Sequence, residues 1–168
     1  NPLGGVALSE LLSDQKVRSL ELLSMWRCGL HDEVLLALAD ADHITTLRIL
    51  YASQNQFTHE GFELLFAAEH LSSLEYLSFA YNDFALPTIE ALFSAPHFDN
   101  LKMRNVASRG HGDEAMKCLA EATSFNALEK MSLYQMRMTS EGVRTLVGSP
   151  KARTLRDLDI SSNRVDDE

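Results

Sequence analysis

The sequence has few of the features that mark secreted or membrane-spanning proteins. It contains two cysteines, Cys28 and Cys118, and no Asn-X-Ser/Thr glycosylation motif. Two cysteines are too few for a disulfide framework, which favours a reducing compartment. We therefore expect a cytoplasmic protein. No apolar run approaches the roughly 20 residues that cross a bilayer. The first residues, NPLGGVALSE, lack the basic flank and the long apolar run of a secretory signal.

Basic residues are also scarce. The chain has 15 Lys and Arg against 24 Asp and Glu, so its net charge is −9. This excess of negative charge argues against nucleic acid or an anionic membrane as the partner. With 45% hydrophobic and 23% charged residues in 168, the composition is that of one globular domain with a sizeable core.

The residue types that carry catalysis or bind metals form no familiar motif. Paired carboxylates at catalytic spacing and a Gly-rich phosphate loop are both missing. His43, His70 and His97 do recur at equal intervals along the chain, and stacked imidazoles could ligate a metal. The alternative, which we favour, is that each histidine bonds a carbonyl at a helix end. The sequence therefore predicts a non-enzymatic protein without metal or cofactor.

What the chain does contain is a strict internal repeat. One column holds leucine at every repeat, each 27 positions after the one before (47 − 20 = 27): Leu20, Leu47, Leu74, Leu101, Leu128 and Leu155. Columns three, five, fifteen and eighteen positions later are also mostly apolar. The first part of each unit alternates with period two, as a strand does, and the second part has helical spacing. Each unit should thus be a strand, a turn and a helix that leads to the next parallel strand.

Two segments, LEYLSFAYNDF and LRDLDISSNRV, have the leucine and asparagine spacing of the first half of a leucine-rich repeat. DEAMKCLAEA and SEGVRTLVGS correspond to its helical half. The whole chain resembles the leucine-rich repeat family, in particular the ribonuclease-inhibitor-like branch with 27-residue repeats. The resemblance implies an α/β fold: a right-handed solenoid bent into a horseshoe arc, with parallel strands on the concave side and helices on the convex side.

The repeats begin at residues 20, 47, 74, 101, 128 and 155, after a partial repeat over 1–19. We interpret 1–168 as a single leucine-rich repeat domain. Asn1 and Glu168 both fall inside a repeat, and neither end shows a polar capping unit. We therefore expect a segment of a longer protein, with pairing of the uncapped ends into an oligomer as the alternative.

Two further columns have structural explanations. Asn55, Asn82 and Asn163 share a column in which the amide can tie the turn after each strand to the backbone of the neighbouring unit. The column after the repeat leucine alternates in sign through Glu21, Arg48, Glu75, Lys102, Glu129 and Arg156. Parallel strands in register would set these opposite charges side by side.

Repeat 101–127 departs most from the pattern. Arg104 occupies an inward column, Arg109 replaces the asparagine and His111 replaces an apolar residue. A buried, unpaired arginine is costly, so we expect the backbone to shift or bulge and bring Arg104 to solvent. The alternative is that these three residues face a partner.

The aromatic residues divide between two faces. All eight Phe fall in inward columns or in the apolar link, whereas the only Trp and all four Tyr fall in columns expected to face outward from the strand layer. Trp and Tyr are enriched at the centres of protein interfaces. We predict a partner-binding site on the concave strand face, formed by Trp26, Arg27, Tyr51, Tyr76, Tyr81, Met103, Asn105 and Tyr134.

The resulting function is a non-enzymatic module that binds a protein partner. The resemblance implies the same, because the family mostly supplies scaffolds, inhibitors and sensors. The alternative is a regulatory subunit or sensor arm: a GTPase activator, a subunit that recognises ligase substrates, or the repeat region of an immune receptor.

Overall fold

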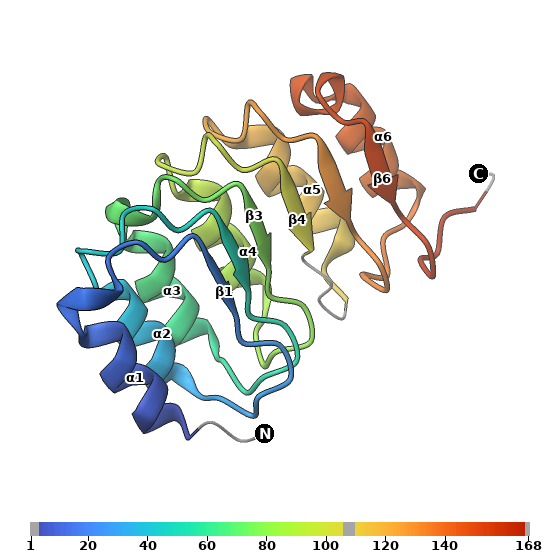
Figure 1. The fold of residues 1–168 in the computed structure, drawn as a ribbon. Coiled ribbons are helices and arrows are strands. Elements are labelled where there is room, and N and C mark those ends of the chain that lie inside the picture. The colour runs from blue at the N-terminus through green and yellow to red at the C-terminus, as the bar shows by residue number, and fades with distance from the viewer. Residues whose placement is uncertain (1–3, 106–109, 167–168) are drawn as a thin grey trace.

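The computed structural model describes residues 4–105 and 110–166, and of residues 103–105 the backbone alone. Its centre is one parallel sheet of six short strands in sequence order (Figure 1). The strands are β1 (Leu22–Ser24), β2 (Ile49–Tyr51), β3 (Tyr76–Ser78), β4 (Met103–Asn105), β5 (Lys130–Ser132) and β6 (Asp157–Asp159).

The register of the sheet is uniform. Leu23 pairs with Leu50 and Leu50 with Leu77, so each partner lies 27 positions further along the chain (50 − 23 = 27). The same offset continues through Arg104, Met131 and Leu158. Residues of one sequence column therefore lie next to each other on neighbouring strands.

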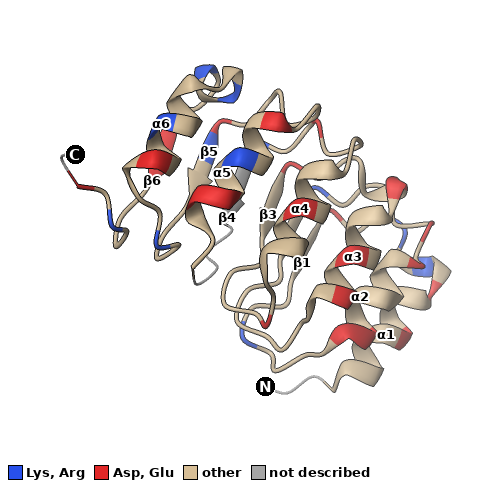
Figure 2. Cartoon of the chain, turned by 180° about the vertical axis from the view of Figure 1, so that it is seen from behind, with Lys and Arg blue, Asp and Glu red and all other residues tan. Residues whose placement is uncertain are grey.

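The helices form a second layer on one side of the sheet (Figures 1 and 2). They are α1 (Gly5–Ser13), α2 (Asp32–Ala39), α3 (His59–Ala67), α4 (Leu86–Ser94), α5 (Gly112–Glu121) and α6 (Ser140–Gly148). Three short 3₁₀ helices lie in the links: η1 (Gln15–Val17), η2 (Glu69–Leu71) and η3 (Pro150–Arg153). Each α-helix packs against the next one in the chain. None of the described helices has the length and apolarity needed to cross a membrane.

The core lies between the two layers and is rich in phenylalanine. Phe62 of α3 has its ring centroid 5.8 Å from Phe57 and 5.0 Å from Phe79. Seven of the eight Phe are buried, and Phe84 is partly buried. The expected inward orientation of the phenylalanines is therefore confirmed.

Asparagine side chains in the turns after the strands join neighbouring repeat units. Oδ1 of Asn55 accepts from the backbone N–H of Cys28 (3.0 Å) and of Leu30 (3.1 Å) in the preceding unit. Its Nδ2 donates to the carbonyls of Met25 (2.7 Å) and Ala52 (3.0 Å). Asn82 and Asn163 make corresponding bonds. The structural role predicted for this column is confirmed.

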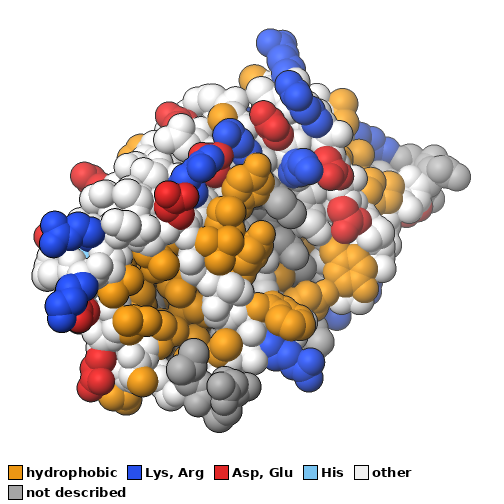
Figure 3. All heavy atoms as spheres, in the orientation of Figure 1, with side chains coloured by type: hydrophobic (Ala, Val, Ile, Leu, Met, Phe, Trp, Pro, Cys, Tyr) orange, Lys and Arg blue, Asp and Glu red, His pale blue; other side chains and the backbone are white. Residues whose placement is uncertain are grey.

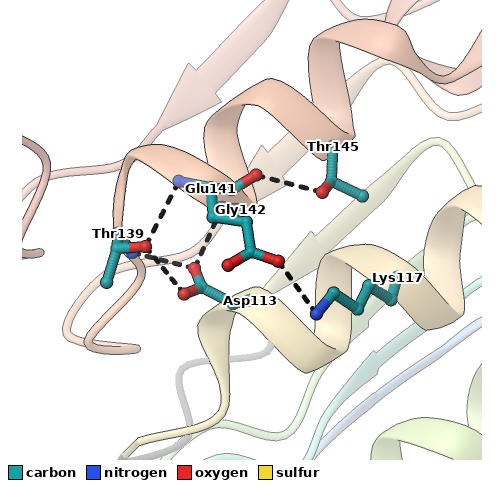
Figure 4. Close-up of polar contacts among 6 residues, drawn as sticks. All are labelled: Asp113, Lys117, Thr139, Glu141, Gly142 and Thr145. Atoms are coloured by element: carbon teal, nitrogen blue, oxygen red, sulfur yellow. Dashed lines mark hydrogen bonds and ion pairs between the residues drawn. The ribbon is translucent and has the colours of Figure 1, made fainter. Parts of the chain in front are cut away.

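Aspartates join neighbouring helices (Figure 4). Asp113, in the first turn of α5, accepts from the N–H of Thr139 (2.8 Å), from its hydroxyl (2.8 Å) and from the N–H of Gly142 (3.1 Å). It thereby satisfies backbone donors at the start of α6, which have no partner within that helix. Asp32 accepts from Thr58 in the same way at the start of α3.

The backbone of repeat 101–127 corrects one expectation. Arg104 pairs in regular register with Leu77 on one side and Met131 on the other, so the predicted bulge in this strand is wrong. Backbone hydrogen bonds to both neighbouring strands hold β4 in line despite the polar residue in an inward column. Arg109 lies outside the described residues, as does the side chain of Arg104. His111 directly precedes α5 and is partly exposed.

Candidate functional site

The candidate site is the side of the sheet that faces away from the helices, together with the turns that follow the strands. We call this surface the strand face. Successive residues of a strand point to opposite sides of a sheet. In β2 the central Leu50 is fully buried, whereas Tyr51 is 39% exposed and Ile49 partly exposed. In β1, Leu22 is 48% exposed. The strand face thus carries large apolar side chains in contact with solvent.

The residues predicted for the site differ in exposure. Trp26 and Tyr81, in turns after β1 and β3, are 55% and 41% exposed, and Arg27 is exposed. Tyr76 and Tyr134 are partly buried. For Met103 and Asn105 the structure describes the backbone of β4, which lies between β3 and β5. Their side chains lie outside the described part.

The strand pairing brings part of this set together. Tyr51 pairs with Ser78, and Tyr76 lies two residues before Ser78 on the same strand, so the two tyrosines are diagonal neighbours. Met103 pairs with Tyr76 and Asn105 with Ser78. Trp26 and Tyr81 follow strands that are two positions apart in the sheet.

The turns after the strands share a backbone conformation that the sequence did not reveal. Arg27, Gln54 and Tyr81 have φ of 54°, 58° and 57°, and two later residues in the same column, Gln135 and Ser162, have 56° and 57°. Residues with a side chain rarely adopt such left-handed angles. The usual signal is Gly or Asn, and neither occurs at these positions. The turn therefore presents a side chain at the same point in every described repeat.

Three of the six residues in the column of alternating charge form ion pairs with each other. Glu75 lies between Arg48, whose Nη2 is 2.6 Å from Oε1, and Lys102, whose Nζ is 2.7 Å from Oε2. Hydrogen bonds from Lys102 and Arg48 lower the pKa of Glu75. These three side chains line an open hollow of about 450 Å³ together with Glu21, Thr45, Thr46, Ser73 and Asn100. Because the charges compensate one another, this column serves strand register better than ligand binding.

At β5 and β6 the strand face is charged. Lys130 of β5 has its Nζ 4.0 Å from Oδ2 of Asp157 in β6. Asp159 accepts from the N–H (2.9 Å) and hydroxyl (2.6 Å) of Ser161 and from the hydroxyl of Ser132 (3.2 Å). The hydrogen bonds from Ser161 lower the pKa of Asp159.

The histidine column matches its prediction at one position. His70 Nε2 lies 3.2 Å from the carbonyl of Leu38 near the end of α2. His43 instead contacts Gln15 through Nδ1 (3.3 Å). Nε2 of His43 and of His97 is buried without a hydrogen-bond partner in the described structure, and burial lowers the pKa of His97. Among the residues that the structure describes, no group of three or more His, Cys, Asp or Glu is arranged to hold a metal ion.

Comparison with known proteins supports a leucine-rich repeat fold. The family model described as a leucine-rich repeat matches residues 151–168. The structure is similar to the crystal structure of an internalin from Listeria monocytogenes, with a TM-score of 0.52 and 20% sequence identity. The similarity covers 80% of this chain and 39% of the internalin chain. The comparison with curated proteins gave no match. The C-terminal end of the chain is thus similar in sequence to a leucine-rich repeat, and most of the chain has a fold similar to that of the internalin.

Proposed function

We propose that the chain is a non-enzymatic module that binds a protein partner on its strand face. In this proposal the chain is one leucine-rich repeat domain of the ribonuclease-inhibitor-like branch. Its 27-residue repeats form a right-handed horseshoe with the strand face on the concave side. The partner is a protein rather than nucleic acid or a membrane, no cofactor takes part, and the module acts in the cytoplasm. Leucine-rich repeat domains generally serve as protein-interaction modules, which agrees with this function.

The observation that carries the proposal is the separation of the aromatic residues. Phenylalanines fill the core, while Trp26, Tyr51 and Tyr81 remain in contact with water. An exposed indole or phenol lacks the hydrophobic stabilisation of roughly 25 cal/mol that burial gives for every Å² of apolar surface. Binding a partner would recover that free energy. Trp and Tyr are also the residues whose truncation most often weakens protein complexes, by about 2 kcal/mol or more at a hot spot.

The test compares two sets of substitutions in affinity capture from a cell extract, with captured proteins quantified by mass spectrometry. Replacing Trp26, Tyr51 and Tyr81 by Ala should remove most of a reproducibly captured partner, because three exposed aromatic contacts are lost together. The matched control replaces Leu36 and Leu64 by Ala. These leucines are 44% and 48% exposed on helices α2 and α3.

Circular dichroism should show that both variants remain folded. Capture that is unchanged by the aromatic substitutions, or that is lost only in the leucine control, would contradict the proposal and move the site to the helix layer.

A further inference from the structure

We infer that the helix layer carries a second docking surface, formed by two hollows on either side of α4, which binds a basic protein segment by taking one Lys or Arg side chain into each hollow. This surface lies on the opposite side of the sheet from the strand face. The inference goes beyond the proposed function and does not rest on it.

The first hollow lies between α3 and α4. It has a volume of about 280 Å³, and its lining includes Glu63, Phe66, Glu69, Ser94 and His97. Phe66 is 3% exposed and supplies apolar wall, whereas Glu63 and Glu69 are exposed. This combination suits Lys and Arg, because their aliphatic stems pack on apolar surface while their charged ends stay near water.

The second hollow lies between α4 and α5 and has a volume of about 600 Å³. Phe93 is 3% exposed and Cys118 partly buried, and both contribute uncharged wall, whereas Glu90 and Glu121 are exposed. Ser94, a small exposed residue of α4, lines both hollows. The two hollows are therefore neighbours with α4 between them.

The carboxylates of the hollows are not paired with Lys or Arg. None of the ion pairs among the residues that the structure describes involves Glu69, Glu90 or Glu121. Glu63 has one contact, in which its Oε2 lies 3.9 Å from Nε2 of His59. The helices α1, α2, α3 and α4 contain no Lys or Arg, and Figure 2 shows acidic residues along them. The charge of this part of the helix layer is therefore complementary to a basic partner.

The titratable walls of the hollows agree with a cationic ligand. Burial raises the pKa of the Cys118 thiol, and the carboxylates of Glu90 and Glu121 raise it further. Burial lowers the pKa of His97, while Glu69 acts in the opposite direction. A neutral thiol and a neutral imidazole leave the carboxylates to an incoming ammonium or guanidinium group. Within the described part of the chain, no group of three or more His, Cys, Asp or Glu is placed to hold a metal ion instead.

The position of α4 between the hollows sets the spacing of the two cationic side chains. Helices that pack side by side lie about 8–10 Å apart, and two hollows that flank one helix are separated by about the same distance. An extended segment covers this distance with about three residues, and a helical segment with about seven. The basic residues of the partner should be separated accordingly.

The probe for the experiment is a displayed library of random peptides about 12 residues long, enough for either spacing. Peptides are selected on the unmodified chain, and those still retained by a variant with Glu63, Glu69, Glu90 and Glu121 all changed to Gln are discarded. We expect the remaining peptides to carry two Lys or Arg residues about three or about seven positions apart.

Binding of synthetic copies is then measured by fluorescence anisotropy, and circular dichroism shows whether each variant is folded. Glu63→Gln/Glu69→Gln and Glu90→Gln/Glu121→Gln should each weaken binding about 2–10-fold, as expected for exposed ion pairs. Both losses should shrink at high salt.

Three further variants separate the hollows from overall charge and from the strand face. The matched control Glu60→Gln/Glu114→Gln removes two exposed carboxylates of α3 and α5 that line neither hollow, and should change the affinity less. Ser94→Trp keeps every charge but fills space on both sides of α4, so it should weaken binding as much as either glutamate pair. Trp26→Ala/Tyr51→Ala alters the strand face, where hydrophobic side chains gather (Figure 3), and should leave the affinity unchanged.

The outcomes that overturn the inference are distinct. Equal losses in the Glu60/Glu114 control would show attraction to the overall charge and not to the hollows. Binding that survives Ser94→Trp, or that is lost in Trp26→Ala/Tyr51→Ala, would place the peptide elsewhere on the molecule. If no selected peptide depends on the four glutamates, the docking surface is wrong, whereas the proposed function of the strand face is untouched.

Discussion

At the scale of single residues, each asparagine of the Asn55 column supplies hydrogen-bond partners to backbone groups that have none within the sheet. The turn after each strand leaves N–H groups without a partner in the sheet, and a buried unpaired N–H costs about 1–3 kcal/mol. Asn55 is 9% exposed and serves two such groups, Cys28 N–H and Leu30 N–H, in the unit before it. One side chain therefore stabilises two repeats.

Replacing Asn55 by Ala should lower the free energy of unfolding by about 2–4 kcal/mol, because two N–H groups lose their acceptor. Urea denaturation monitored by circular dichroism measures the change. The control is Asn100→Ala, where an exposed amide donates a single bond of 3.0 Å to the carbonyl of Ser72. Equal losses in the two variants would show that the column has no special role.

The sequence identified this column because asparagine recurs there at the spacing of the repeat leucines. It also placed Arg48, Glu75 and Lys102 side by side, and the ion pairs are present. It did not reveal the left-handed turns, since Arg27, Gln54 and Tyr81 have positive φ although none of them is Gly or Asn. Nor did it separate His70 from His43, because the hydrogen-bond partner of each imidazole depends on the segment packed against it.

At the scale of the elements, the start of α6 depends on α5. Asp113 of α5 accepts from Thr139 and Gly142, and Lys117, one turn further along α5, pairs with Glu141 at 3.0 Å (Figure 4). A Cβ on Gly142 would overlap Oδ1 of Asp113 and lie 2.6 Å from Cγ of Met138. Glycine is thus needed here for close approach of two helices.

The variant Gly142→Ala should lower the free energy of unfolding by about 1–3 kcal/mol, the usual cost of overpacking. Gly148→Ala at the other end of α6 is the matched control, because nothing lies within 4 Å of a Cβ there. Alanine favours a helix over glycine by up to about 1 kcal/mol, so the control should be neutral or slightly stabilising. A Gly142→Ala variant as stable as the control would mean that α5 and α6 can separate without cost.

At the scale of the whole molecule, each strand pairs with the next strand and each α-helix packs against the next helix. Interactions limited to neighbouring units make stability depend on position along the array. Leu77 in the central strand β3 is 2% exposed, whereas Leu158, the residue of the same column in β6, is 41% exposed. The burial that stabilises the middle of the sheet is therefore incomplete at β6.

Native-state hydrogen exchange should follow this gradient. Amides bonded between β2 and β3, such as Tyr76 N–H to Arg48 O, should exchange at least about 10-fold more slowly than those of β6, such as Asp157 N–H to Glu129 O. Mass spectrometry or NMR measures the rates. Equal protection at β3 and β6 would indicate that the chain opens as one cooperative unit.

The sequence by itself determined the alternation of strands and helices, the constant offset between paired strands and the burial of the phenylalanines. All of these follow from apolar side chains that recur at fixed spacing and must be removed from water together. Only the tertiary structure decided that β4 stays in register at Arg104, that the turns adopt left-handed angles, and how far each aromatic residue on the strand face is exposed. These properties depend on hydrogen bonds and contacts between neighbouring units, and the pattern within one unit does not specify them.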